Sequence, residues 1–509
     1  MRATEINAIG ELAEDALAAG AGLIQQLHEG VSGRPLAILG AAGVPVRIVH
    51  DRIVTTVYDC VRAGLRAGAR TATVAARTAA ALSAPRAGNE AVSLVATPRG
   101  AVALGALNGL FGNHLATAGN GLAVDMEIRR HGDAVAATPR GLARGFPDAG
   151  SRVALFIHGL CETEESWRRR RPPGRDGSGA ARRTYGERLQ DELGFTPVHL
   201  RYNSGLRISD NGRRLAELLD DVVASWPVPL SELVLVGHSM GGLVARSACH
   251  YGQQNGASFT GVVRRVLCLG SPHLGADLEK GINVIAWGCG QLPETRALRG
   301  FLNARSVGIK DLRFGSCLEV DWRECDPDEL LRDRCQEVLF LADADYYFIA
   351  ASLRDPALGL LLGDLLVRTP SASGRGRGSG RRVRFEAANG RELRGLTHFD
   401  LLNHPAVYEQ IRTWIVASDR RQTSGSGGRL RSVVELVGDG QVVGGEAGRV
   451  VVDLVDQQLI ESPRCSRWRA IVRYSLGSAR CVRGIVTSAC MRSARGVGVA
   501  VCRASWGSE

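Results

Sequence analysis

The stretch LVLVGHSMGG, from Leu233 to Gly242, constrains the fold of this chain more than any other feature. Its opening run of four apolar residues suits a strand that is buried on both faces of a parallel sheet. Gly237 and Gly241 then flank Ser239 with the spacing of a sharp strand-to-helix turn, where a Cβ on either glycine would collide with a neighbouring strand or helix. The pattern therefore predicts a strained, protruding serine that can act as a nucleophile.

Short apolar runs alternate with amphipathic helices from Ser151 onward. Runs over 153–159, 196–203 and 264–272 read as strands, and residues 208–226 form a helix with one apolar stripe. Such alternation predicts an α/β fold, a mostly parallel sheet with helices on both faces. Further strands are expected within Val338–Ser352 and in the stretch RVRFEAANG, which begins at Arg382.

The chain divides by composition into several regions. Residues 1–130 are Ala-rich and expected to be helical, either as a layer packed on the body or as an amphipathic, lipid-facing arm. The other regions are a catalytic domain (151–417) with an Arg-rich insertion (168–183) and a stretch that could cap a pocket (275–336), a linker (418–431) and a tail (432–509). The tail shows no clear periodicity, so its role is unknown and it is expected to be poorly ordered.

The positive charge belongs to two appendages rather than to the body. The segment 168–183 contributes +6 and the segment 462–508 contributes +9 to a net charge of +11, so the remainder of the chain carries −4. Aromatic residues are sparse in both segments, which argues against base stacking. Nucleic-acid binding is therefore not expected.

The twelve cysteines show no CxxC pair and no zinc-ligand spacing. Acidic residues near the N-terminus do not suit a signal peptide, and no run of 18 apolar residues suggests a membrane span. We therefore expect a cytoplasmic or peripherally membrane-associated protein whose thiols are mostly reduced and buried. A disulfide within Cys317–Cys335 is the alternative.

A nucleophilic serine needs a base, an acid that orients the base, and an oxyanion hole. The base should follow the acid in sequence. His398 lies in a loop just before a C-terminal amphipathic helix, where a base is expected, whereas His404 beside Pro405 suits helix capping. His238 is expected to point from the opposite side of the serine turn, and His273 to have a structural loop role.

Asp364 is the candidate acid, because it lies on a Gly-Asp turn between the expected strand and the candidate base. An ordinary Asx-turn is the alternative explanation for this residue, and Asp343 and Asp345 remain competitors. The oxyanion hole needs main-chain N–H groups. Met240, directly after the serine, and Leu160, directly after the strand that ends in FIHG, are the expected donors.

Five motifs together resemble those of a known enzyme family. FIHGL, GHSMGGLVARS, GSPHLGA, GDLLV and HFDLLNHPAVYEQI occur in this order over about 153–417. They look like the serine lipase/esterase branch of the α/β-hydrolase superfamily, and especially like its bacterial triacylglycerol-lipase-like and PGAP1-like groups. The resemblance implies the α/β-hydrolase fold and a triad of Ser239, Asp364 and His398, with Leu160 and Met240 as oxyanion donors.

The implied activity is hydrolysis of carboxylic esters, with a lipidic ester as the expected substrate. No metal or organic cofactor is required for this chemistry. Two other functions remain open: acyl transfer with the same triad, in which an alcohol replaces water, and a non-catalytic scaffold that binds a lipid or a protein partner. Residues 1–130 could add peripheral contact with a membrane or lipid surface.

Overall fold

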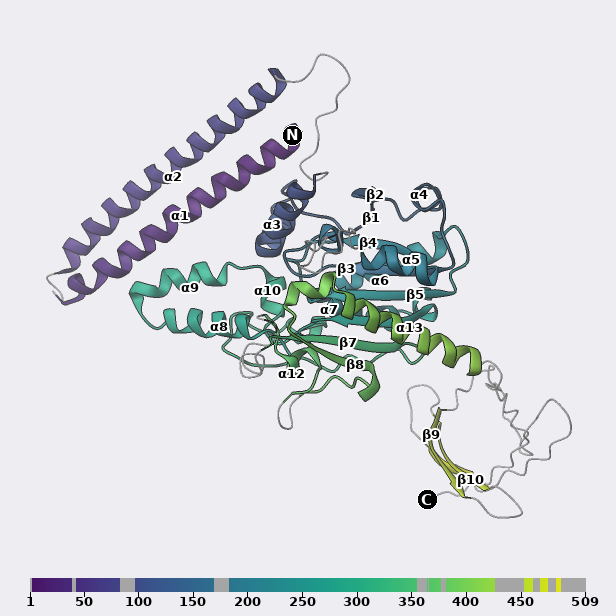
Figure 1. Cartoon of the computed structure of the whole chain (residues 1–509). Coiled ribbons are helices and arrows are strands. Elements are labelled where there is room, and N and C mark those ends of the chain that lie inside the picture. The colour runs from purple at the N-terminus through teal and green to yellow at the C-terminus, as the bar shows by residue number, and fades with distance from the viewer. Residues whose placement is uncertain are drawn as a thin grey trace, which may run out of the picture. The chain divides into compact units, whose positions relative to one another are not determined.

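The computed structural model describes residues 2–38, 43–82, 97–168, 183–354, 364, 366–376, 381–425, 453–460, 467–474 and 482–486 (Figure 1). Contacts divide the chain into two units, Met1–Ile415 and Val416–Glu509. Most of the Arg-rich insertion 168–183 lies outside the described residues.

An eight-stranded sheet forms the centre of the first unit, with the strand order β2-β1-β4-β3-β5-β6-β7-β8. The strands from β4 to β8 in this order pair in parallel, whereas β1 runs antiparallel to both β2 and β4. This arrangement confirms the predicted α/β fold. The strands span Glu127–Arg130 (β1), Asp133–Val135 (β2), Arg152–Ile157 (β3), Thr196–Arg201 (β4), Glu232–His238 (β5), Val263–Leu269 (β6), Asp345–Ser352 (β7) and Gly390–Arg394 (β8).

Helices cover both faces of the sheet (Figure 1). The apolar side chains on these faces are buried in two cores. Leu155 and Ile157 of β3 pack in one core with α6 and α7, whereas Ala154 and Phe156 pack in the other with α5 and α13. The two cores follow from the period-two alternation of side chains along each strand. These helices span Tyr185–Leu193 (α5), Ile208–Ser225 (α6), Met240–Gln254 (α7) and Pro405–Gly425 (α13).

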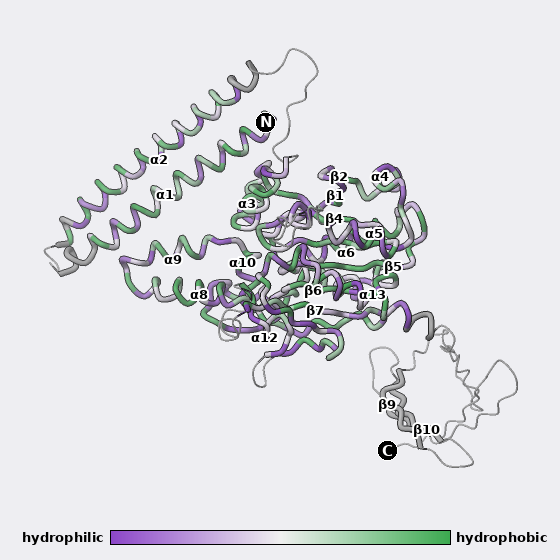
Figure 2. The backbone as a smooth tube through the Cα atoms, viewed as in Figure 1, coloured by the Kyte–Doolittle hydropathy of each residue, from purple (hydrophilic) through white to green (hydrophobic). Residues whose placement is uncertain are grey.

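The N-terminal region is helical, as predicted, with α1 (Ala3–Ile38), α2 (Gly43–Leu82) and α3 (Pro98–Thr117). Arg62 Nη1 of α2 donates to Gln25 Oε1 of α1 at 2.6 Å, and hydrophobic residues recur along both helices (Figure 2). Strand β1 lies inside the region 1–130, so part of that region belongs to the central sheet. Among the described residues, no helix combines the length and the apolar character that crossing a membrane requires.

Two predicted strands are wrong in their bounds. Strand β7 begins only at Asp345, so residues 338–344 precede it. The last strand is Gly390–Arg394, not the stretch RVRFEAANG, whose Val383 and Phe385 are buried in the core without forming a strand. β8 is an edge strand with polar, largely exposed side chains, which is why apolar alternation did not reveal it.

The segment 275–336 is mainly helical. It contains α8 (Asp277–Cys289), η5 (Pro293–Thr295), α9 (Arg296–Asn303), α10 (Val307–Asp311) and η6 (Glu319–Asp321). Cys317 and Cys335 are free thiols here. Of the described cysteines only Cys249, Cys268 and Cys317 are buried, so the expectation that most thiols are buried does not hold for this part of the chain.

The second unit contains a three-stranded antiparallel sheet of order β11-β10-β9, where the tail was expected to lack order. Its strands are Asp453–Ile460 (β9), Arg467–Tyr474 (β10) and Val482–Val486 (β11). Helix α13 continues to Gly425 through the first part of the predicted linker. The rest of that linker lies outside the described residues.

Candidate active site

Ser239 lies on a strained turn between β5 and α7. Its φ of 51° and ψ of −120° are unusual for a residue other than glycine. A Cβ at Gly241 would lie 2.3 Å from the carbonyl oxygen of Ile157, and a Cβ at Gly237 would lie 2.4 Å from the nitrogen of Gly242. Both glycines are thus needed for close backbone approach, as the G-x-S-x-G spacing predicted.

Asp364 and His398 form a buried hydrogen-bonded pair. His398 Nδ1 lies 2.7 Å from Asp364 Oδ2, and the two side chains are 4% and 1% exposed. Asp364 Oδ1 also accepts the N–H groups of Leu366 (3.0 Å) and Val367 (2.7 Å), and the His398 N–H donates to the Asp364 carbonyl at 3.2 Å. These contacts fix the carboxylate and leave His398 Nε2 for another partner.

The two competing acids lie at the wrong end of the sheet. Asp345 is the first residue of β7 and accepts a hydrogen bond from Tyr347 Oη, and Asp343 is exposed just before that strand. Parallel α/β sheets hold their chemistry beyond the carboxyl ends of the strands, where Ser239 follows β5 and His398 follows β8. The structure therefore brings Asp364, and neither competitor, to the candidate base.

Ser239, His398 and Leu160 line one cavity of about 260 Å³. Its other lining is mostly apolar, and it includes Leu278 and Ile282 of α8. Within the described residues no hydrogen bond joins Ser239 to His398, and such bonds often form only when substrate binds. The remaining residues of the wall are Cys161, Glu162, Pro272, Ala276, Glu279, Ile309, Leu312, Leu366, Val367 and Phe399.

The expected oxyanion donors lie on a tight turn and at a helix start. In the turn after β3, Gly159 N–H donates to Glu162 Oε2 (2.8 Å), Cys161 N–H to Ser204 Oγ (3.1 Å) and Glu162 N–H to Gly159 O (3.3 Å). The N–H of Leu160 is the remaining one in this turn. Met240 is the first residue of α7, where helix N–H groups have no partner within the helix.

Two other histidines have structural partners. His404 Nδ1 accepts the N–H of Ala406 at 3.2 Å in the first turn of α13, which agrees with the predicted capping role. His273 is completely buried, and its Nδ1 lies 3.1 Å from Arg246 Nη1. Burial and the Arg246 charge hold the pKa of His273 well below its usual value, so its ring is neutral.

Glu162 is a functional candidate that the sequence analysis missed. Its Oε2 lies 3.0 Å from Nδ1 of His238, the residue before the candidate nucleophile. Burial favours the neutral acid, but the His238 charge and hydrogen bond outweigh it and lower the pKa of Glu162 to about 2. Burial likewise opposes a charge on His238, yet the Glu162 charge and hydrogen bond raise the pKa of His238 above its usual value.

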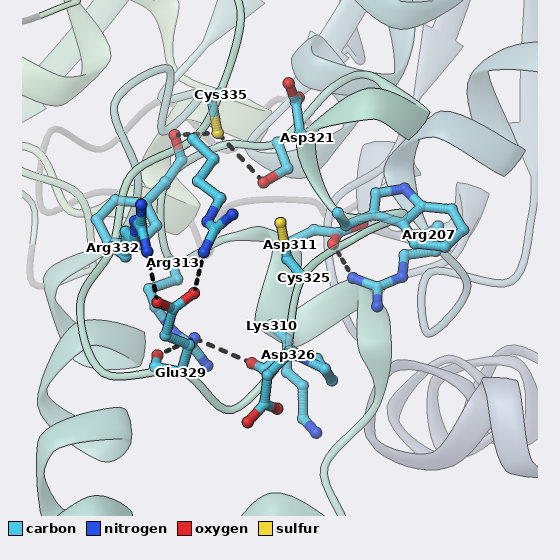
Figure 3. A pocket seen from close by; sticks show the side chains of 15 residues that line it. Arg207, Lys310, Asp311, Arg313, Asp321, Cys325, Asp326, Glu329, Arg332 and Cys335 are labelled. Carbon is cyan, nitrogen blue, oxygen red and sulfur yellow. Dashed lines mark hydrogen bonds and ion pairs between the residues drawn. The ribbon is translucent and has the colours of Figure 1, made fainter.

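A second pocket, of about 50 Å³, is lined by charged side chains of the segment 275–336 and by Arg207 (Figure 3). Glu329 pairs there with Arg332 (3.2 Å) and Arg334 (2.8 Å), and Arg207 pairs with Asp311. Because its charges neutralise one another, we assign this pocket a structural role. The described residues contain no group of three or more His, Cys, Asp or Glu side chains that could hold a metal ion.

Comparison with known proteins finds one family match over part of the chain and several similar solved structures. The model of the family "PGAP1-like alpha/beta domain" matches residues 184–300. No curated protein matches the chain in sequence. Similar solved structures include the mature lipase BlEst2 of Bacillus licheniformis, at 17% identity and a TM-score of 0.32, covering 52% of this chain and 91% of that protein.

The esterase Pf2001 of Pyrococcus furiosus is a further similar structure, at 10% identity and a TM-score of 0.28, covering 53% of this chain and 83% of the esterase. A lipase-esterase related protein of Clostridium acetobutylicum is similar at 15% identity and a TM-score of 0.26, covering 52% of this chain and 94% of that protein. Residues 184–300 thus resemble a PGAP1-like α/β domain, and they lie in the mostly parallel α/β fold described above.

Proposed function

We propose that the chain is a serine hydrolase that cleaves carboxylic esters. One observation carries this proposal: His398, which is hydrogen-bonded to Asp364, lines the same cavity as Ser239. A nucleophile, a base and an orienting acid that meet at one cavity are the elements that acyl transfer to water requires.

The residues have distinct roles in this reaction. Ser239 Oγ attacks the ester carbonyl carbon while His398 Nε2 takes its proton, and Asp364 stabilises the resulting imidazolium. The N–H groups of Leu160 and Met240 stabilise the oxyanion. His398 then gives the proton to the departing alcohol, and water attacks the acyl-enzyme by the same steps to release the acid and free Ser239.

The proposed substrate is a lipidic ester. The apolar side chains around the cavity, among them Leu278, Ile309 and Leu312, suit an acyl chain better than a charged acid. Leu278 (60% exposed) and Phe399 (48% exposed) also reach the surface beside the cavity. An apolar path thus connects the nucleophile to the outside.

We also propose that the N-terminal helices contact a lipid surface. α1 and α2 expose large apolar side chains along their length, including Ile24 (57%), Val31 (62%), Ile48 (56%) and Ile53 (58%). An extended apolar surface along a helix pair is typical of a site that a partner or a membrane covers. This contact would place a cytoplasmic or peripheral enzyme at the surface that holds its substrate.

Hydrolysis of p-nitrophenyl esters with two to twelve carbons in the acyl chain tests the substrate class. Each methylene group buried in the cavity contributes about 0.8 kcal/mol, so kcat/KM should rise about fourfold per methylene until the cavity is full. A profile that falls from acetate onward would contradict a lipidic substrate. Turnover that appears only when an alcohol acceptor is added would instead support an acyltransferase.

A further inference from the structure

His238 occupies a buried position that touches three parts of the candidate active site. It is completely buried and precedes Ser239 in the chain. Its Nδ1 lies 3.0 Å from Glu162 Oε2, and its Nε2 lies 3.2 Å from the main-chain oxygen of His398. The ring is therefore joined to the turn after β3, to the nucleophile and to the loop that carries the base.

Both nitrogens of the His238 ring face hydrogen-bond acceptors. A neutral imidazole carries one N–H, so it could donate to only one of them, whereas an imidazolium donates to both. Glu162 Oε2 already accepts the N–H of Gly159 at 2.8 Å, which suits an ionised carboxylate. The hydrogen-bond geometry thus favours a buried imidazolium–carboxylate pair.

The surroundings of this pair favour the same charge state. Asp364, from the segment after β7, contributes a second negative charge near His238, and the pKa of His238 is raised. The His398 ring centroid lies 4.7 Å from that of His238, and the edge of Trp167 from η3 (Glu164–Arg168) packs against it at 6.2 Å. The pair is shielded from water, so its attraction is stronger than that of an exposed pair.

The pair also holds the turn that carries one oxyanion donor. Through the Gly159 N–H, Glu162 closes the turn in which the N–H of Leu160 lies. Helix α3 packs directly on this turn, because Gly109 lets it approach so closely that a Cβ there would lie 2.7 Å from the nitrogen of Cys161. Contacts with α3 and with the Glu162 carboxylate thus fix the conformation of this turn.

We propose that Glu162 and His238 form an ion pair that positions two parts of the active site without taking part in proton transfer. These parts are the turn that carries the Leu160 N–H and the main chain of His398. The proposal rests on the proposed function, because it assigns these residues a role relative to Ser239, His398 and Leu160. Both are positioning residues. Loss of one oxyanion donor lowers kcat by about 10²–10³-fold, so misplacing one should lower kcat by about 10²-fold and leave KM nearly unchanged.

The test compares Glu162→Gln with Glu164→Gln. Glutamine at position 162 keeps the shape and an acceptor oxygen but removes the charge, so His238 loses the partner that keeps it doubly protonated. Glu164 is a matched control, because it is also buried and ionised but pairs with Arg201 (Nε–Oε2 2.7 Å). The readouts are kcat and KM for p-nitrophenyl butyrate, and the melting temperature.

The expected result is a loss of about 10²-fold in kcat for Glu162→Gln with little change in KM. Glu164→Gln should lower the melting temperature and leave kcat within threefold of wild type. If Glu162→Gln does not fold, Glu162→Asp replaces it in the test. This variant keeps the charge on a shorter side chain, so its loss in kcat should be smaller than the loss of about 10²-fold expected for glutamine.

A folded Glu162 variant with wild-type kcat, or an equal loss in Glu164→Gln, would overturn the proposal. Neither result contradicts the proposed ester hydrolysis, because wild type is active in both cases. A folded wild type that hydrolyses no ester would remove the proposed function and this inference with it.

Discussion

Replacing Asp364 by asparagine separates the charge of this side chain from its place in the fold. Asp364 Oδ1 accepts the N–H groups of Leu366 and Val367, and the amide oxygen of asparagine can still accept both. The amide –NH₂ would then take the place of Oδ2, 2.7 Å from His398 Nδ1, and donate where the carboxylate accepts. His398 would be held with its proton on Nε2, so it could not take the proton of Ser239.

The expected loss is large. The wrong histidine tautomer lowers kcat by about 10⁴-fold in a serine-protease triad, which corresponds to about 5.5 kcal/mol of transition-state stabilisation. Hydrolysis of p-nitrophenyl butyrate measures the loss, and a thermal melt checks the fold. Asp343→Asn is the matched control, because Asp343 is exposed before β7, and it should leave kcat unchanged. A folded Asp364→Asn variant within tenfold of wild type would refute the reasoning, as would an equal loss in Asp343→Asn.

Three further predictions concern stability and surface binding. Gly241→Ala should lower the free energy of unfolding in urea by about 3 kcal/mol, because its Cβ would lie 2.3 Å from a β3 carbonyl oxygen. The control Gly281→Ala in α8 meets nothing within 4 Å and should be neutral or stabilising. Equal stabilities of the two variants would contradict the tight turn. The stability difference between wild type and Glu162→Gln should be largest between pH 4.5 and 6.5, the ordinary pKa values of the two groups. It should shrink as the pH falls from 4.5 toward the Glu162 pKa of about 2, and as the pH rises from 6.5 through the raised pKa of His238. A difference independent of pH would argue against the ion pair. Deleting residues 2–82 should leave p-nitrophenyl butyrate turnover intact and weaken sedimentation with phospholipid vesicles, whereas loss of folding would favour a helical layer that packs on the body.

The turn around the candidate nucleophile could be predicted from sequence because its determinants are local. Gly237, Ser239 and Gly241 lie within five residues, and both glycines are required by close contacts with the main chain. The order of acid and base along the chain likewise pointed to Asp364 and His398, which the structure brings to 2.7 Å. That distance also depends on β7 and β8 being neighbours in the sheet, which the sequence analysis did not predict.

Other features depend on contacts that no short pattern encodes. Glu162 is one of three glutamates in the stretch CETEES, and only its contact with His238, 76 residues away, distinguishes it. Strand β8 carries polar residues at the edge of the sheet, so it lacks the apolar signal that marked the central strands. The buried residues Val383 and Phe385 gave that signal instead, because packing in a loop against the core also favours apolar side chains.

Labelling with a fluorophosphonate tests most directly whether Ser239 is the nucleophile of a serine hydrolase. Folded wild type and Ser239→Ala are treated with the reagent, and the intact mass and the modified peptide are measured alongside p-nitrophenyl butyrate turnover. The proposal predicts one adduct on wild type, located at Ser239, and no adduct on Ser239→Ala, with turnover reduced by about 10⁶-fold. A folded wild type that neither labels nor turns over ester, or an alanine variant that does both as wild type does, would contradict it.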